Sequence, residues 1–83
     1  MRRRRQPKPR LTVLVPSEQT AEVRGTGGFR VLERLKVPKM WQKLPPSGGP
    51  PCWTIPARHA VDVIAMAEHL GGQARIDRQQ VLL

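Results

Sequence analysis

The side chains with the clearest chemical character in this sequence are basic, and they are unevenly spread. Residues 1–10 carry six Lys or Arg and no acidic residue, and residues 24–43 carry six against Glu33 alone. Residues 44–83 carry three of each sign. Solubility does not require such clustering, whereas it is expected of a surface that meets a polyanion. The sequence therefore indicates nucleic acid as the first candidate partner.

Within these basic stretches, some residues have the chemistry to read base pairs and others to hold phosphates. Lysine can donate to guanine acceptors and glutamine can pair with adenine. The candidate base-reading residues for double-stranded DNA are therefore Lys39, Gln42 and Lys43. The candidate phosphate-binding residues are Arg2, Arg3, Arg4, Arg5, Arg30, Arg34 and Lys36. A solvated basic face would have the same composition, and that alternative stays open for each residue.

The remaining reactive side chains form no recognisable catalytic or metal site. The six acidic residues are dispersed and no nucleophile is paired with a base at a known spacing, so we expect no enzymatic activity. Cys52, His59 and His69 are too few and too scattered to close a zinc site, and no cofactor is indicated. The sequence lacks an apolar run of the roughly 18 residues that a membrane span needs, and no signal-peptide core follows Arg5. We therefore expect a cytoplasmic protein with no membrane partner.

The elements that must position these residues are predicted to be mainly helical. The longest helix is expected from Pro56 to Leu70, because proline suits a first helical position and apolar residues then recur at helical spacing. Gly71 can adopt the left-handed conformation that ends a helix. Capping residues or prolines predict three shorter helices, over residues 17–24, 26–35 and 38–44. The last of these would carry the three base-reading side chains.

The other segments are assigned from their composition. Residues 1–10 are predicted to form a disordered basic arm, and residues 11–83 a single domain. Apolar and β-branched residues favour a short strand over Leu11–Val15, while proline and glycine make residues 45–51 a loop. Trp53 is expected to pack against the core, since no other aromatic residue lies near it in sequence to build a stacking site.

Several short motifs follow the order found in one family of DNA-binding proteins. They are Gly27-Gly28, Leu35 and Val37 around a turn, Trp41, Gly48-Gly49, Ile55-Pro56-Ala57-Arg58-His59, Gly71-Gly72, Arg75 and Asp77. On these motifs, residues 17–78 resemble the small Cro-like helix-turn-helix repressors of temperate phages and prophages. The resemblance implies a mainly α, compact four-helix helix-turn-helix domain. It further implies a phage-type transcriptional regulator, with a homodimer as the expected assembly and its third helix in the major groove of duplex DNA.

A second function, from a different class, fits the same sequence. The protein would be a small basic adaptor that binds a protein partner or structured RNA through its arm and the loop at residues 45–51. In that case the folded part only displays the two binding segments. Tighter binding of a selected duplex than of random duplex would favour the regulator, whereas loss of a partner on deletion of the loop would favour the adaptor.

Overall fold

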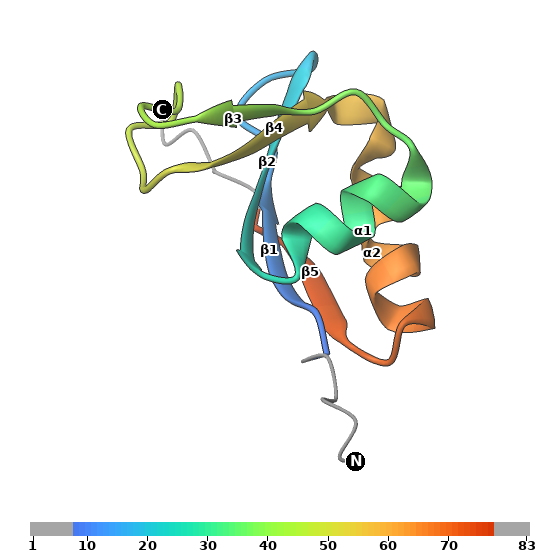
Figure 1. Ribbon diagram of the computed structural model, residues 1–83. Helices are drawn as coiled ribbons and strands as arrows, with labels where there is room; N and C mark the ends of the chain where they lie inside the picture. Colours follow the sequence, from blue (N-terminus) through green and yellow to red (C-terminus); the bar gives the residue numbers. More distant parts are fainter. Residues whose placement is uncertain (1–7, 78–83) are drawn as a thin grey trace.

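The computed structural model describes residues 8–77, which form a five-stranded sheet and two short helices (Figure 1). In chain order the elements are β1 (Arg10–Leu14), β2 (Thr20–Thr26), α1 (Gly28–Leu35), β3 (Met40–Gln42), β4 (Cys52–Pro56), a 3-10 turn (Ala57–His59), α2 (Ala60–His69) and β5 (Gln73–Asp77). The expectation of a mainly α, four-helix helix-turn-helix domain is therefore wrong. The chain is a mixed α and β protein.

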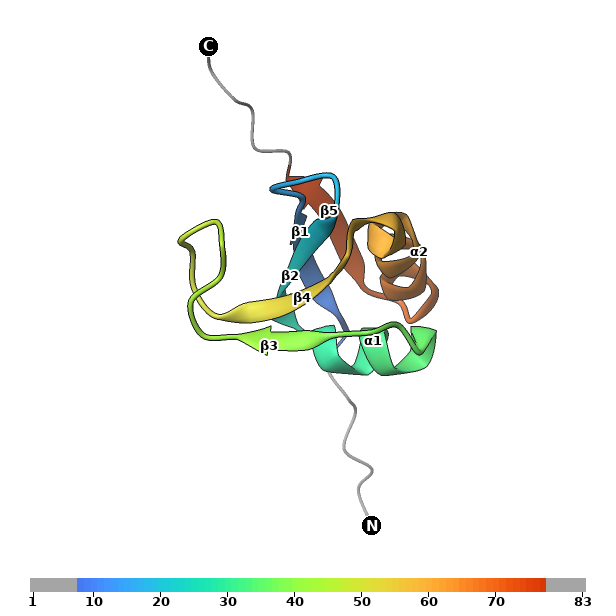
Figure 2. The ribbon, with the colours of Figure 1, turned by 90° about the horizontal axis from the view of Figure 1, so that it is seen from above.

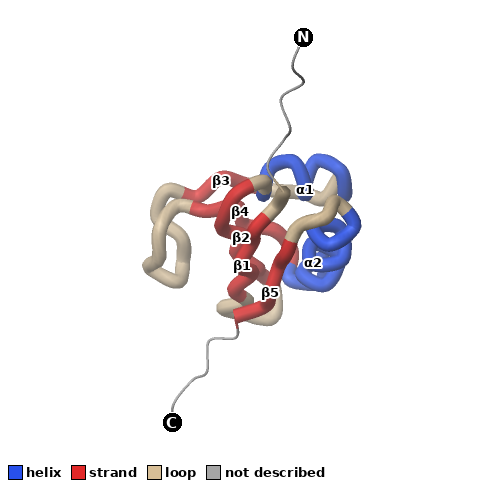
Figure 3. The backbone as a smooth tube through the Cα atoms, turned by 90° about the horizontal axis from the view of Figure 1, so that it is seen from below, coloured by secondary structure: helices blue, strands red, loops and turns tan. Residues whose placement is uncertain are grey.

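The strands lie in the order β3-β4-β2-β1-β5. Neighbouring strands are antiparallel except β1 and β5, which run parallel because α2 carries the chain back before β5 begins. Figures 2 and 3 show α1 and α2 together on one side of the sheet. We call this the helix side; within the described residues, the opposite face carries no helix.

The core lies between the sheet and the two helices. Alternate residues of the strands point into it, among them Val13 of β1 and Val23 of β2, which are fully buried cross-strand partners. The helices contribute Leu32 and Val63, which are also fully buried. The eleven buried residues of this cluster are all Leu, Val, Ile or Ala. Trp53 is partly buried and packs against this cluster, as predicted.

The helix predicted over residues 17–24 is wrong, because this stretch contains a turn and most of β2. Ala21, Glu22 and Val23 are buried one after another because both faces of this central strand are covered, and pairing with β1 and β4 supplies the backbone hydrogen bonds. The Ser17 hydroxyl accepts hydrogen bonds from the backbone N–H of Gln19 (3.3 Å) and of Thr20 (3.1 Å). Serine thus makes the local bond expected of a helix cap, but uses it to close the turn before β2.

The recognition helix predicted over residues 38–44 is also wrong. Met40–Gln42 form β3, an edge strand whose central residue, Trp41, pairs with Trp53 of β4. Two prolines bounding a short polar stretch are compatible with a short helix, yet such a helix has few hydrogen bonds of its own. Pairing with β4, which the sequence did not predict, stabilises the extended form instead.

The helices predicted over residues 26–35 and 56–70 are confirmed, with later starts. Thr26 is still in β2, and α1 begins at Gly28. Pro56 ends β4 with an extended ψ of 136°, so the helical conformation starts at Ala57, first as a 3-10 turn and then as α2. Proline's missing N–H is compatible with a strand end as well as with a helix start, which explains the shift by one residue.

Both helices end on a left-handed residue. Gly71, just beyond α2, has φ of 83°, as its residue type predicted. Lys36, just beyond α1, has φ of 55° and donates its backbone N–H to the Glu33 carbonyl oxygen at 3.2 Å. A lysine adopts this conformation at a cost of about 1–2 kcal/mol, because its Cβ approaches the following carbonyl group.

The short strand predicted near the N-terminus is confirmed as β1, but the fold begins before residue 11. Pro9 is buried, and its carbonyl oxygen accepts a hydrogen bond from the backbone N–H of Gln73 at 2.8 Å. A Cβ atom at Gly72 would collide with the Pro9 backbone, so glycine is needed where the chain enters β5. The predicted phosphate-binding residues Arg2, Arg3, Arg4 and Arg5 lie outside the described residues.

Candidate nucleic-acid interface

All three aromatic residues of the chain lie together near the β3 edge of the sheet. The ring of Trp53, on β4, lies 5.5 Å from that of Phe29 in the first turn of α1, with 43° between the planes. Trp41, on β3, meets Trp53 edge to face at 5.1 Å. Phe29 is 51% exposed and Trp41 50% exposed. We call Phe29, Trp41 and Trp53 the aromatic cluster.

The strand register explains why the two tryptophans share one side of the sheet. Cross-strand partners point the same way, and Trp41 pairs with Trp53, which pairs in turn with Val23 of β2. Because Val23 is buried beneath the helices, both tryptophans lie on the helix side. Gly28 then brings the start of α1 close, since a Cβ placed there would lie 3.6 Å from the Trp53 ring. Phe29 follows directly and completes the aromatic cluster.

Sequence reasoning missed this cluster because it looked for stacking partners only among near neighbours of Trp53. One signal could have found it. The triplets Met-Trp-Gln at 40–42 and Cys-Trp-Thr at 52–54 flank a proline- and glycine-rich stretch, which is the pattern of a hairpin with a long loop. Pairing the two triplets in register brings their tryptophans together.

Lys39 connects the aromatic cluster to α1. Its Nζ lies 5.3 Å from the centre of the Phe29 ring, within the range of a cation–π contact. The same Nζ lies 3.1 Å from a carboxylate oxygen of Glu33, the only acidic residue of α1. Lys39 is largely covered, with 18% of its side chain exposed, whereas Glu33 is 54% exposed. The one negative charge on α1 is therefore already paired.

Other cations of α1, of its C-terminal end and of the residue after β3 have no acidic partner among the described residues. Arg30 and Arg34 lie four residues apart on α1, hence on one side of the helix, and Lys36 follows at its end. Lys43 is exposed directly after β3. No carboxylate of the described residues lies within ion-pair distance of any of these four side chains. Together with Lys39 they form a basic rim, which we define as Arg30, Arg34, Lys36, Lys39 and Lys43.

The structure separates the residues predicted to read bases. Gln42 is the cross-strand partner of the buried Cys52 and lies on the face opposite the helices, where its Nε2 is 3.2 Å from the sulfur of Met40. Lys39 lies on the helix side, against Phe29. The structure thus places Lys39 against Phe29 and Glu33 of α1, and Gln42 on the other face of the sheet.

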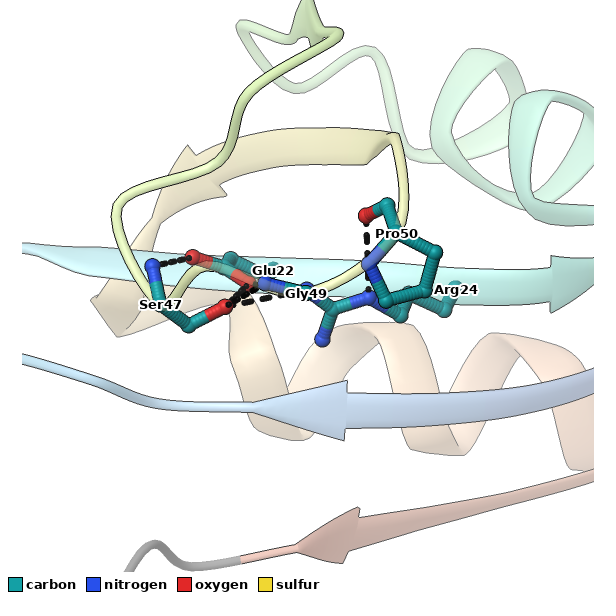
Figure 4. Close-up of polar contacts among 5 residues, drawn as sticks. All are labelled: Glu22, Arg24, Ser47, Gly49 and Pro50. Atoms are coloured by element: carbon teal, nitrogen blue, oxygen red, sulfur yellow. Dashed lines mark hydrogen bonds and ion pairs between the residues drawn. The ribbon is translucent and has the colours of Figure 1, made fainter.

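The loop between β3 and β4 folds onto the sheet face opposite the helices (Figure 4). Glu22 of β2 is fully buried there, and its carboxylate accepts hydrogen bonds from the Ser47 hydroxyl at 2.6 Å and the Ser47 N–H at 3.2 Å. Arg24 pairs with Glu22 at 2.6 Å and donates to the Pro50 carbonyl oxygen at 3.3 Å. The inner side of this loop is therefore engaged in the protein's own fold, while its prolines 46, 50 and 51 are exposed.

Cys52 lies beside this network and is 1% exposed. Burial raises the pKa of the Cys52 thiol, and the negative charge of Glu22 raises it further, with only Arg24 acting in the opposite direction. A thiol held in its neutral form is a poor nucleophile. Nothing at Cys52 therefore suggests covalent chemistry.

Within residues 8–77, no three His, Cys, Asp or Glu side chains are grouped as a metal ion would require. No helix in the same range is long and apolar enough to cross a membrane. Comparison of the chain with protein-family models, with curated proteins and with solved structures finds no match.

Proposed function

We propose that the protein binds nucleic acid through the basic rim around the aromatic cluster. The observation that carries the proposal is the contact of Lys39, the residue before β3, with both Phe29 and Glu33, because it places one cation of the β3 segment against α1, which carries Arg30 and Arg34. Because the rim's only acidic neighbour on α1 is already paired, the remaining charge is available to phosphates. The arginines at positions 2–5 would add affinity from outside the described residues.

Regulation of transcription stays a prediction, and the recognition helix on which it depended has been replaced by β3. We expect phosphate contacts from the basic rim to contribute affinity with little sequence information. A cytoplasmic location and a homodimer are proposed as the simplest setting for such binding. The adaptor function also stays a prediction, but it would have to use the outer side of the loop, since Ser47 and Pro50 are bound to β2.

The salt dependence of binding tests the proposal. Fluorescence anisotropy of a labelled oligonucleotide would be measured from about 50 to 200 mM salt, where phosphate contacts lose much of their strength. The double variant Arg30→Ala/Lys43→Ala should weaken binding and reduce the slope of log K against log salt by about 2, because about one unit is expected for each phosphate contact removed.

The matched control removes two exposed cations elsewhere. Arg75 lies on β5 at the opposite edge of the sheet, and Arg58 lies in the 3-10 turn before α2. The double variant Arg58→Ala/Arg75→Ala has the same net charge as the rim variant, so any difference between them reports on position. Equal weakening by the two variants, or no binding by the unmodified chain, would contradict the proposal.

A further inference from the structure

The basic rim alone does not explain why the rings of the aromatic cluster are exposed. The chain has three aromatic residues; its fully buried core residues are all aliphatic, and of the aromatic residues Trp53 packs against that core. An aromatic ring that served only packing would gain most by being buried. Phe29 and Trp41 instead keep about half of their surface in solvent, and both touch Trp53.

Exposed aromatic rings next to cations favour a ligand that has both a flat π face and negative charge. A nucleobase presents a flat π face, and stacking on an aromatic side chain is favourable for every base type. The phosphates on either side of that base carry the charge that Lys43 and Arg30 lack as partners within the described residues. One ligand, a short stretch of nucleic acid backbone with its bases, therefore satisfies both the aromatic cluster and the basic rim.

The bases must be unpaired for this contact. In a duplex each base is stacked on its neighbours and hydrogen-bonded to its partner, so exposing its face means unstacking it at a cost of a few kcal/mol. In a single strand that cost is largely absent. We propose, resting on the nucleic-acid binding proposed above, that Trp41 stacks on an unpaired nucleobase beside Phe29 and that the preferred ligand is single-stranded nucleic acid.

Trp41 is the residue on which the contact depends most. It lies on the edge strand, half exposed, and its contact with Trp53 is edge to face, which holds the ring without covering it fully. The ammonium group of Lys39 already lies against the Phe29 ring. A base stacked on Trp41 would bring its phosphate within contact distance of that ammonium group. Lys39 would thus contact the Phe29 ring and a phosphate of the bound strand at the same time.

Intrinsic fluorescence reports on this surface directly, because both tryptophans of the chain belong to the aromatic cluster. The full chain would be titrated with oligothymidylate, with oligouridylate and with a mixed-sequence duplex, each of about 12 units, a length within the range that single-strand sites cover. We expect the single strands to quench the emission and to bind about tenfold more tightly than the duplex. The two single strands distinguish DNA from RNA as the preferred source of unpaired bases.

An abasic strand of the same length separates stacking from charge, because it keeps the phosphates and lacks the bases. Trp41→Leu should weaken oligothymidylate binding about tenfold, as expected for loss of a base stack, and should leave abasic-strand binding unchanged. Trp41→Phe should restore most of the affinity. Met40→Ala is the matched control, since Met40 is the exposed apolar neighbour on the opposite face of β3.

The outcomes distinguish this inference from the proposed function. Equal affinity for oligothymidylate and the abasic strand, together with no effect of Trp41→Leu, would overturn stacking and leave phosphate binding intact. Tighter binding of the duplex than of either single strand would overturn the preference for unpaired bases. If none of these probes binds, the proposed function fails and this inference with it.

Discussion

Replacing Glu22 with glutamine should loosen the loop between β3 and β4 and destabilise the whole domain. Glu22→Gln keeps the shape of the side chain, so no cavity forms, and it removes the charge together with one of the two acceptor oxygens. The carboxylate is fully buried and accepts bonds from Arg24 and from two groups of Ser47. Removing one member of a buried ion pair costs about 3–5 kcal/mol, because the other charge is left uncompensated.

The estimate for this site is smaller, since 18% of the Arg24 side chain is exposed and water can solvate part of its charge. The amide of the variant also keeps one acceptor oxygen for Ser47. We therefore expect Glu22→Gln to lower the free energy of unfolding by about 2–3 kcal/mol, below the full cost of an orphaned buried charge. For a domain of this size that corresponds to a fall in Tm of roughly 10–20 °C, at about 4–8 °C per kcal/mol.

Urea unfolding, followed by circular dichroism and by tryptophan fluorescence, measures the change. Coincident transitions from the two probes would support two-state unfolding. Glu18→Gln is the matched control, because Glu18 is exposed and makes no ion pair among the described residues; its effect should stay within about 0.5 kcal/mol. An equally small effect of Glu22→Gln would refute the view that this network anchors the loop.

Two further predictions concern a strained residue and a buried thiol. Lys36→Gly should raise the free energy of unfolding by about 0.5–1 kcal/mol, since glycine relieves the left-handed strain at φ 55° but adds entropy to the unfolded chain. A lower urea denaturation midpoint would contradict this expectation. The same variant should weaken nucleic-acid binding, because it removes one cation of the basic rim. Burial and Glu22 raise the pKa of Cys52, so above about pH 8.5 the unfolded chain loses a proton that the folded chain retains, and stability should fall as pH rises further. Urea unfolding between neutral and alkaline pH checks this, and Cys52→Ala, which has no thiol to titrate, should show a smaller decline.

Local sequence signals were sufficient for the elements whose pattern is local. The apolar spacing after Pro56 and the left-handed Gly71 located the 3-10 turn and α2 together to within one residue at each end, although α2 itself starts at Ala60, and β-branched residues located β1. Lys36 occupies a conformation that favours glycine, and α1 still ends there, with Leu35 before it packed against the core and Val37 after it buried in the core. Prediction worked for α2, whose hydrogen bonds close within a few residues, and for β1, whose β-branched composition favours a strand whatever its partners.

Prediction failed where the hydrogen-bond partners lie far apart in sequence. The segment 20–26 is a strand because β1 and β4 flank it, and Ser17 gave the same local signal for a turn as for a helix cap. Met40–Gln42 are extended because β4 returns beside them after a long loop. The aromatic cluster was not predicted for the same reason, since Phe29, Trp41 and Trp53 are neighbours only after folding.

Nuclear magnetic resonance of the isotope-labelled chain tests the central claim most directly, because it shows which surface a nucleic acid contacts. On addition of oligothymidylate, the account predicts the largest shifts at the indole N–H groups of Trp41 and Trp53 and at the backbone amides of Phe29, Lys39 and Lys43. Arg75, on β5 at the far edge of the sheet, should change little. Shifts centred on β1 and β5, with the two indole signals unmoved, would contradict it.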